Sequence, residues 1–532
     1  MTDRPYLFHE LTNAICSTCL RKVEAMVIEQ DSRIYLDKRC PEHGHERVLI
    51  ATDAEYWRLM RRTVKPGQVP KRFNTKVEYS CPMDCGLCPG HEQHSCLTVV
   101  EITDRCNLEC PVCYAGSAPD PALKHRSLEQ VIAMLDAVVA NEGEPDIVQI
   151  SGGEPTLHPD FFTILDEARA RPIKHLMVNT NGVRLASDRA FAEKLATYMP
   201  GFELYLQFDS LNAAPIKELR GADLRESRMK AIDTVNELGI STTLVVTVQK
   251  GLNDHELGEL IDYAIKQPAV RGVTFQPTSM AGRVDEKFDP AVDRLTLTEV
   301  RTKLLEQSSL FTKEDVVPVP CHPDCIAMGY ALKLPPEVAK LLGSKQESAS
   351  FKGRIAASLG MLKRNNPASE AGVKLEDGRV VVPLTRYIEP GSLLEHGGST
   401  IVYEQVPELR QQVVDLFSTA HSPESSANCI GNLLCCLPGI EMPQGIGYDN
   451  LFRVIIMQFM DPWNLDVRSV KKSCVHIAHP DGRIIPFDTY NIFYRPGLEE
   501  NWKRAAKASN PLMSEEQLER GPIPLRGEKV QA

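Results

Sequence analysis

Residues 99–115, VVEITDRCNLECPVCYA, join an apolar run to a loop that carries three cysteines. The run 97–103 predicts a buried β-strand. Cys106, Cys110 and Cys113 follow with three and then two residues between them. Three thiolates at this spacing can hold three irons of a 4Fe–4S cluster and leave the fourth iron open to a small ligand. A loop directly after a strand would place that iron at the C-terminal end of a sheet, where α/β proteins bind their cofactors.

Strand and helix patterns alternate downstream of this stretch. Strands are predicted at 97–103, 146–150, 175–179, 203–208, 242–248 and 271–276. Helices are predicted to begin at Ser127, with Gln130 completing a capping box, after Pro159, Ser187, Arg225 and His255, and at Thr296. Six such βα repeats predict parallel strands with right-handed crossovers, so the core is of the α/β class. A partial barrel and a doubly wound sheet both fit this pattern.

Residues 1–65 predict a small β unit held together by a metal ion. Cys16 and Cys19 precede two predicted strands, 23–29 and 33–37, and Cys40 and His43 follow them. A hairpin between two such ligand pairs brings all four side chains to one end, as in zinc ribbons and rubredoxins. Three cysteines and one histidine favour zinc, with iron as the alternative ion. The competing interpretation is two unrelated thiol pairs.

A second triad, Cys81, Cys85 and Cys88, repeats the spacing of the first within segment 66–96. No βα series of its own follows it, and Cys96 stands close enough to be a fourth ligand. Four thiolates close a cluster, so this segment predicts an auxiliary centre rather than a cofactor site. The alternative for Cys96 is a buried free thiol.

The remaining cysteines come from the C-terminal half of the chain and number enough for a third cluster. Cys435 and Cys436 are adjacent and point apart in an extended chain, so both need not be ligands. The candidate ligands are Cys321, Cys325, Cys429, Cys435 and Cys474.

The chain divides by pattern into five segments. After 1–65 and 66–96 come the βα core at 97–310, an α+β auxiliary-cluster domain at 311–500 with a polar mobile insertion at 340–372, and a poorly ordered tail at 501–532. Two Asp-Gly hairpins are predicted, around Asp377-Gly378 and Asp481-Gly482. A helix is expected near 450–460.

Composition and charge narrow the class of protein. The 532 residues carry a net charge of −11, so nucleic acid is not an expected partner. No apolar run reaches the length of a membrane span and no signal-peptide pattern opens the chain, which predicts a cytoplasmic protein. Sixteen cysteines in such a chain point to metal binding rather than to disulfides.

The stretch SGGEP at 151–155, after the second predicted strand, completes a recognisable pattern. Together with the Cys106 triad it resembles the radical S-adenosylmethionine (SAM) superfamily, whose open iron binds the amino and carboxylate groups of SAM. The resemblance implies that Gly152, Gly153 and Glu154 border the amino group of SAM. It also implies that Asn179, Asn181, Gln207 and Asp209 face its ribose and carboxylate. One departure is Val112, where the superfamily commonly has an aromatic residue; Tyr114 stands two positions later.

The whole layout resembles one branch more closely, the archaeal tetraether lipid synthases and their relatives described as class D radical methylases of pterin biosynthesis. The likeness lies in CPMDCGLCPGHEQHSC at 81–96, VRGVTFQPTSMAGR at 270–283 and CVHIAHPDGRIIPFDTYN at 474–491. It implies a partial (βα)6 barrel, one catalytic and two auxiliary 4Fe–4S clusters and a mononuclear zinc or iron.

The leading functional hypothesis is a radical SAM enzyme that joins carbon atoms of lipid alkyl chains. The alternatives are a radical C-methylase of a pterin-type substrate and a non-catalytic iron–sulfur electron carrier. An RNA-modifying enzyme is disfavoured by the acidic charge. The enzyme hypotheses imply an electron donor such as a ferredoxin or flavodoxin and a lipid or other small-molecule substrate. A lipid substrate would imply peripheral membrane association.

Overall fold

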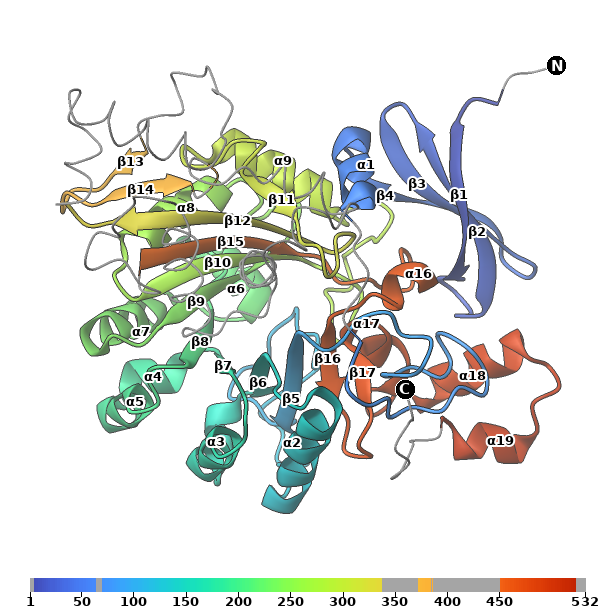
Figure 1. The fold of residues 1–532 in the computed structure, drawn as a ribbon, viewed down its shortest axis with the longest axis horizontal. Coiled ribbons are helices and arrows are strands. Elements are labelled where there is room, and N and C mark those ends of the chain that lie inside the picture. The colour runs from blue at the N-terminus through green and yellow to red at the C-terminus, as the bar shows by residue number, and fades with distance from the viewer. Residues whose placement is uncertain (1–3, 64–68, 337–371, 384, 386–449, 523–532) are drawn as a thin grey trace, which may run out of the picture.

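The computed structural model of the chain describes residues 4–63, 69–336, 372–383, 385 and 450–522. These residues form a four-stranded N-terminal sheet and a thirteen-stranded central sheet (Figure 1). The predicted insertion at 340–372 lies outside the described residues except for Gly372, and Cys429, Cys435 and Cys436 lie outside them as well.

The N-terminal sheet is an antiparallel meander of β1 (Leu7–Ile15), β2 (Lys22–Gln30), β3 (Arg33–Cys40) and β4 (Gly44–Ala51). The two predicted strands correspond to β2 and β3. Asp31 and Ser32 turn the chain between them with φ of 53° and 58°, which suits the twist of a two-residue hairpin. Helix α1 (Ala54–Arg62) follows, and the Asp53 side chain caps it by accepting a hydrogen bond from the N–H of Tyr56.

The core of the central sheet consists of six parallel strands that neighbour one another in chain order. They are β5 (Leu97–Thr103), β6 (Ile147–Gly152), β7 (His175–Thr180), β8 (Phe202–Gln207), β9 (Thr242–Val248) and β10 (Val270–Pro277). All six correspond to predicted strands. Every residue of β5 is buried, as expected of a parallel strand covered on both faces.

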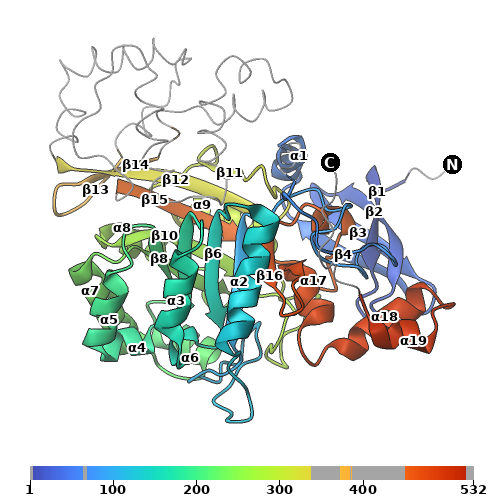
Figure 2. The same ribbon diagram turned by 60° about the horizontal axis from the view of Figure 1, so that its bottom comes forward.

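Helices cross between these strands on the outer face of the sheet, as Figure 2 shows for α2, α3 and α7. The connecting elements are α2 (Leu128–Glu142), η1 (Pro155–Leu157), α3 (Phe161–Arg169), α4 (Val183–Ser187), α5 (Arg189–Ala196), α6 (Ala213–Arg220), α7 (Arg225–Leu238), α8 (Leu257–Lys266) and α9 (Leu297–Gln307). The predicted capping box of α2 is present: Ser127 and Gln130 exchange hydrogen bonds between side chain and backbone. The partial α/β barrel therefore follows the predicted repeats.

The C-terminal region, expected as an α+β domain, shares this sheet instead of building one of its own. β15 (Leu451–Met457) lies parallel to β10, and β16 (Val475–Ala478) lies parallel to β5. Beyond β15 the sheet continues antiparallel through β12 (Ile326–Leu334), β14 (Val380–Pro383) and β13 (Val373–Lys374), and β11 (Val316–Pro318) pairs with β12.

The predicted helix at 450–460 is wrong, since those residues contain strand β15. The segment LFRVIIM is rich in β-branched residues and is buried on both faces, so its apolar positions show no alternation. A short apolar run of this kind cannot be told from a buried helix by periodicity alone.

The last described residues fold rather than form a loose tail. They comprise α16 (Val467–Val470), β17 (Ile484–Pro486), α17 (Phe487–Thr489), the π-helix η6 (Tyr490–Tyr494), α18 (Glu499–Ser509) and α19 (Glu515–Arg520). Trp502 of α18 is buried, and its indole N–H donates a hydrogen bond of 3.0 Å to the carbonyl of Met83. The prediction of a poorly ordered tail is therefore wrong for residues 501–522.

Both predicted Asp-Gly hairpins are confirmed, as the pairs β13–β14 and β16–β17. Among the described residues, no helix combines the length and apolar character that crossing a membrane requires.

Candidate active site and metal centres

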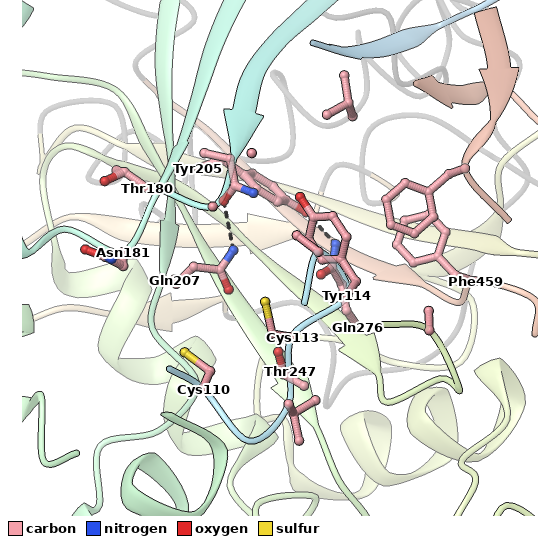
Figure 3. A pocket seen from close by; sticks show the side chains of 18 of the residues that line it. Cys110, Cys113, Tyr114, Thr180, Asn181, Tyr205, Gln207, Thr247, Gln276 and Phe459 are labelled. Atoms are coloured by element: carbon pink, nitrogen blue, oxygen red, sulfur yellow. Dashed lines mark hydrogen bonds between the residues drawn. The ribbon is translucent and has the colours of Figure 1, made fainter. Parts of the chain in front are cut away.

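A cavity opens at the C-terminal ends of the central strands, and the loop after β5 forms one of its walls (Figure 3). Cys106, Cys110 and Cys113 all line it. Arg283, which follows β10, holds the loop in place: its Nε donates to the carbonyl of Cys110 at 2.6 Å, and its backbone exchanges hydrogen bonds with Cys113. Gly282 permits this close approach, because a Cβ there would lie 2.2 Å from the carbonyl oxygen of Tyr114.

The three thiols are chemically suited to binding an iron–sulfur cluster. Burial raises the pKa of Cys106 to about 12 and also raises that of Cys110, so these two thiols would stay protonated without a metal. A bound metal holds such groups as thiolates through its own charge. Among the described residues, the cysteines whose sulfurs gather within 4.8 Å of one another belong to two other groups. The Cys106 triad is not one of these close groups, and a 4Fe–4S cluster binds each of its cysteines through a separate iron.

The Gly-Gly pair lets the end of β6 pack against the cysteine loop. A Cβ on Gly152, whose φ is +130°, would lie 2.2 Å from the carbonyl oxygen of Thr103, and one on Gly153 would lie 2.2 Å from that of Arg105. Both glycines line the cavity, and no other residue could bring the backbone so close.

Glu154 was expected beside the SAM amino group, and the structure places its carboxylate behind the cavity wall. It accepts hydrogen bonds from the hydroxyls of Thr156 and Thr180 at 2.7 and 2.8 Å and from the N–H of Asn181 at 2.8 Å. Burial raises the pKa of this carboxyl. In this arrangement Glu154 joins the ends of β6 and β7.

Three of the four polar residues predicted after strands three and four line the cavity: Asn179, Asn181 and Gln207 (Figure 3). The Gln207 Nε2 donates to the Asn179 Oδ1 at 2.9 Å, and Asn179 in turn donates to the hydroxyl of Ser151 at 3.1 Å. Asn181 donates to the side chain of Asn107 in the cysteine loop at 2.7 Å. These amides therefore form a hydrogen-bonded rim along the strand ends.

Asp209 does not face the cavity as expected. It is fully buried and paired with two arginines, Arg220 at 2.6 Å and Arg228 at 2.7 Å. Although burial opposes ionisation, these two cations hold the pKa of Asp209 well below its usual range. Asp209 lies two residues beyond the end of β8 and has a φ of 64°, so the strand alternation that directs Gln207 into the cavity does not continue to it.

Arg220, at the C-terminus of α6, is a cavity residue that the sequence did not indicate. Its Nη2 donates to the Gln207 Oε1 at 3.2 Å and to the Thr247 hydroxyl at 2.9 Å. A cation beside the thiols favours their ionised form, and Arg220 acts in this direction on the pKa of Cys110. No motif marks it, because it stands far from the cysteines in the chain and only the fold brings it near.

Aromatic side chains cover one side of the cavity. The rings of Phe459 and Phe487 stack with centroids 3.9 Å apart, and Tyr114 packs on Phe487 at 5.2 Å. The Tyr114 hydroxyl is hydrogen-bonded to that of Ser151 at 3.1 Å. Tyr114, displaced from the usual aromatic position, thus still lines the cavity.

The N-terminal unit brings its four predicted ligands together. The Sγ atoms of Cys19 and Cys40 lie 3.7 Å apart, and the Nδ1 of His43 lies 3.6 Å from the Sγ of Cys16 and 3.5 Å from that of Cys40. A tetrahedral zinc ion would space its sulfur and nitrogen ligands roughly 3.5–3.8 Å apart. The donor set therefore fits a mononuclear metal.

Cys96 does not lie with the Cys81 triad, of which it was the predicted fourth ligand. Its thiol lies with those of Cys321 and Cys474, all within 4.8 Å of one another, rather than completing the set of Cys81, Cys85 and Cys88. The Cys321 and Cys474 sulfurs are 3.5 Å apart. Cys96 ends the loop before β5 and Cys474 immediately precedes β16, so the parallel pairing of these two strands brings the thiols together. Cys325 is buried outside this group.

The other predicted auxiliary ligands, Cys81, Cys85 and Cys88, lie in the loop segment that packs on the C-terminal helices. The Thr489 hydroxyl donates to the Cys85 sulfur at 2.9 Å, and the Tyr494 hydroxyl accepts from the Cys85 N–H at 3.2 Å. Burial and the neighbouring thiol of Cys81 raise the pKa of Cys85 well above its usual value. This segment remains a proposed cluster site.

Comparisons with known proteins match two parts of the chain to family models. Residues 100–264 match the model of the radical SAM superfamily, and residues 8–52 match that of the HMPTM N-terminal zinc ribbon domain. Among solved structures, Streptococcus suis SuiB bound to S-adenosylmethionine is 20% identical with a TM-score of 0.32, covering 40% of this chain and 46% of that one.

Among curated proteins, 7,8-dihydro-6-hydroxymethylpterin dimethyltransferase of Methanocaldococcus jannaschii is 30% identical over 534 residues, which cover 93% of this chain and 97% of that protein. A GTP 3′,8-cyclase of Haemophilus influenzae is 29% identical over 196 residues, and the chain spans about half of its length. Membership of the superfamily carries with it a 4Fe–4S cluster and SAM as cofactors, and the cavity residues above fit both. The chain belongs to the radical SAM superfamily and, within it, to the family of the Methanocaldococcus jannaschii protein.

Proposed function

We propose that this protein is a radical SAM enzyme that methylates carbon in a pterin-type substrate. The observation that carries the proposal is the similarity, over 93% of the chain, to a protein named 7,8-dihydro-6-hydroxymethylpterin dimethyltransferase. The matched zinc ribbon before the radical SAM region supports it further.

The leading hypothesis from the sequence, bond formation between lipid alkyl chains, is not confirmed. The Methanocaldococcus jannaschii relative, which is named for a pterin substrate, favours the pterin alternative instead. A purely electron-carrying protein is also disfavoured, because a carrier has no need of a cavity rimmed by Asn179, Asn181 and Gln207 next to the cysteine loop.

The roles of the residues follow from their places around the cavity. Cys106, Cys110 and Cys113 would hold the 4Fe–4S cluster, which would supply the electron needed for reductive cleavage of SAM and so for hydrogen abstraction from the substrate. Gly152 and Gly153 let backbone approach the methionine end of SAM. The amides of Asn179, Asn181 and Gln207 offer hydrogen bonds to its polar groups.

Arg220 and the aromatic wall complete the site. Arg220 holds Gln207 in place and puts a positive charge beside the thiol loop. Phe459 and Phe487 keep water away from that side of the cavity, which protects a reactive carbon radical from quenching. An external reductant must deliver the electron, and a ferredoxin or flavodoxin is the proposed donor.

The test uses anaerobic protein with reconstituted clusters, a chemical reductant, SAM and 6-hydroxymethyl-7,8-dihydropterin. We expect 5′-deoxyadenosine to accumulate and the pterin to gain the mass of one or two methyl groups, with no product from Cys106→Ala protein. Formation of 5′-deoxyadenosine with alkyl lipids and none with the pterin would contradict the proposal. Assays with and without a folate one-carbon donor and with methyl-labelled SAM would show the source of the carbon.

A further inference from the structure

The cavity extends below the rim of amides into the interior of the barrel. Side chains two residues apart on a strand share a face, so Tyr205 lies about 7 Å deeper along β8 than Gln207. Gln149 on β6 lines the cavity together with Tyr205, and Gln276, near the C-terminal end of β10, hydrogen-bonds to the Tyr205 hydroxyl. The apolar side chains of Leu97, Val99, Met457 and Val475 line the cavity as well.

Gln149 is a polar side chain whose amide is left unpaired. It is 5% exposed, it lines the cavity, and its Nε2 has no hydrogen-bond partner among the described residues. A buried amide N–H without a partner is costly and therefore rare in native proteins. A ligand that accepts hydrogen bonds at this point would remove the cost.

Tyr205 and Gln276 form a second polar group across the barrel. The Gln276 Nε2 donates to the Tyr205 hydroxyl at 3.1 Å (Figure 3). Because Nε2 is engaged in this way, the Gln276 carbonyl oxygen is the end that can accept from a ligand. Burial raises the pKa of Tyr205, so its hydroxyl stays protonated and can itself donate.

The floor of the barrel is closed by buried charges. Arg453 on β15 pairs with Glu203 at 2.6 Å, and His175 lies 3.2 Å from the same carboxylate. Glu203 and His175 are almost completely buried. A long alkyl chain running down the barrel axis would have to separate this ion pair, which is strongly unfavourable. The interior therefore suits a compact ligand better than a lipid tail.

We propose that Gln149 and the Tyr205–Gln276 pair determine substrate specificity by binding the hydrogen-bonding edge of a planar heterocycle. The ring lies in the cavity beside the wall formed by Tyr114, Phe459 and Phe487, whose aromatic surface can pack against its face. The Gln149 amide donates to a ring nitrogen or carbonyl oxygen, and the Gln276 carbonyl accepts from an amino or ring N–H group. A pterin presents both kinds of group along one edge, so this inference rests on the proposed function and names the residues that recognise its substrate.

The experiment measures ligand binding to the cluster-loaded protein in the presence of SAM by anaerobic calorimetry. The probes are 6-hydroxymethyl-7,8-dihydropterin and the matching lumazine, in which a carbonyl replaces the 2-amino group. For Gln149→Leu we expect the Kd of the pterin to rise by about tenfold or more, because the leucine cannot donate a hydrogen bond. The Kd of SAM should stay unchanged. Gln276→Leu should weaken pterin binding and reduce the preference for pterin over lumazine.

Met177→Leu is the matched control. Met177 pairs with Gln149 in the sheet, is buried, and is not among the residues that line the cavity. The volume-conserving change should leave the Kd of the pterin within about twofold of wild type. An equal loss in this variant would show a general packing effect and overturn the inference.

The experiment distinguishes a failure of this inference from a failure of the proposed function, because pterin binding and methylation are measured separately. Gln149→Leu and Gln276→Leu proteins that bind the pterin as wild type does would overturn the inference, whether or not methylation occurs. Gln149-dependent binding without methylation would support the inference and refute the proposed function. Wild-type protein that binds neither heterocycle would refute both. If the Gln149→Leu protein does not fold, the pterin affinity of the Gln276→Leu protein tests the inference. Gln276 is only half-buried, so its substitution should disturb folding less.

Discussion

The carboxylate of Asp209 accepts two hydrogen bonds from the guanidinium of Arg220. The Arg220 Nη2 donates to Oδ1 at 2.6 Å, and the Arg220 Nε donates to Oδ2 at 2.7 Å. The same carboxylate also binds Arg228, so one buried anion organises two cations behind the cysteine loop. Through Arg220 it holds Gln207 and Thr247 at the cavity edge. Asp209 is therefore a positioning residue for side chains that line the cavity.

Substituting Asp209→Asn should impair both stability and activity. The change leaves two buried guanidinium groups without their anion, which costs about 3–5 kcal/mol in the free energy of unfolding. We expect a lower Tm and less 5′-deoxyadenosine per cluster. The control is Asp223→Asn, since Asp223 pairs with Arg225 on the exposed surface and should change neither. Wild-type stability in Asp209→Asn protein would refute the positioning role.

The loss of iron in cysteine variants should follow which thiols lie together in the structure. Because Cys96, Cys321 and Cys474 lie together, Cys96→Ala and Cys474→Ala should each remove the same iron, and the double variant should lose no more than either single variant. Cys96→Ala combined with Cys85→Ala should lose iron additively. The measurement is iron content and the electron paramagnetic resonance spectrum of reduced protein. Additive loss in the first pair would contradict the grouping.

His43 should be needed to retain the N-terminal metal. Burial would raise the pKa of Cys40, but hydrogen bonds from His43 and the backbone lower it to about 6, so this thiol is ready to bind metal at neutral pH. We expect His43→Ala protein to release its metal to a chelator faster than wild type and to lose stability in the β1–β4 sheet.

The control for this variant is His45→Ala. His45 is close in sequence but pairs with Asp37 at 2.8 Å and is not among the four grouped ligands. Metal release, followed with a colorimetric chelator, should match wild type in His45→Ala protein. Equal release from both variants would show that His43 is not a ligand. Elemental analysis of the released ion distinguishes zinc from iron.

Because of Asp488, the free energy of unfolding should decrease as the pH rises. Burial raises the pKa of this carboxyl to about 7, against hydrogen bonds such as the one from the N–H of Met460 at 2.6 Å. The folded state therefore holds a proton that the unfolded state releases near pH 4, and stability declines between about pH 4 and pH 7. In Asp488→Asn protein this decline should be smaller. Urea unfolding across that pH range measures it, and an unchanged slope would refute the assignment.

Much of the fold could be predicted from local patterns. The six strands of the barrel core are short and each contains a cluster of apolar residues, and the helices between them carry caps such as Ser127. Such signals lie within a few residues of one another, so they can be read along the chain. Strand β15 carries no such signal, because a run buried on both faces shows no periodicity.

The residues that can bind metal are recognisable along the chain, because ligand type and close spacing are local properties. The pairs Cys16–Cys19 and Cys40–His43 converge as their spacing predicts. The partners of Cys96, the burial of Asp209 and the positions of Arg220 and Gln149 in the cavity follow from the folded structure alone. Each of these depends on strands and loops far apart in the chain being brought together by the sheet, a relationship that spacing does not record.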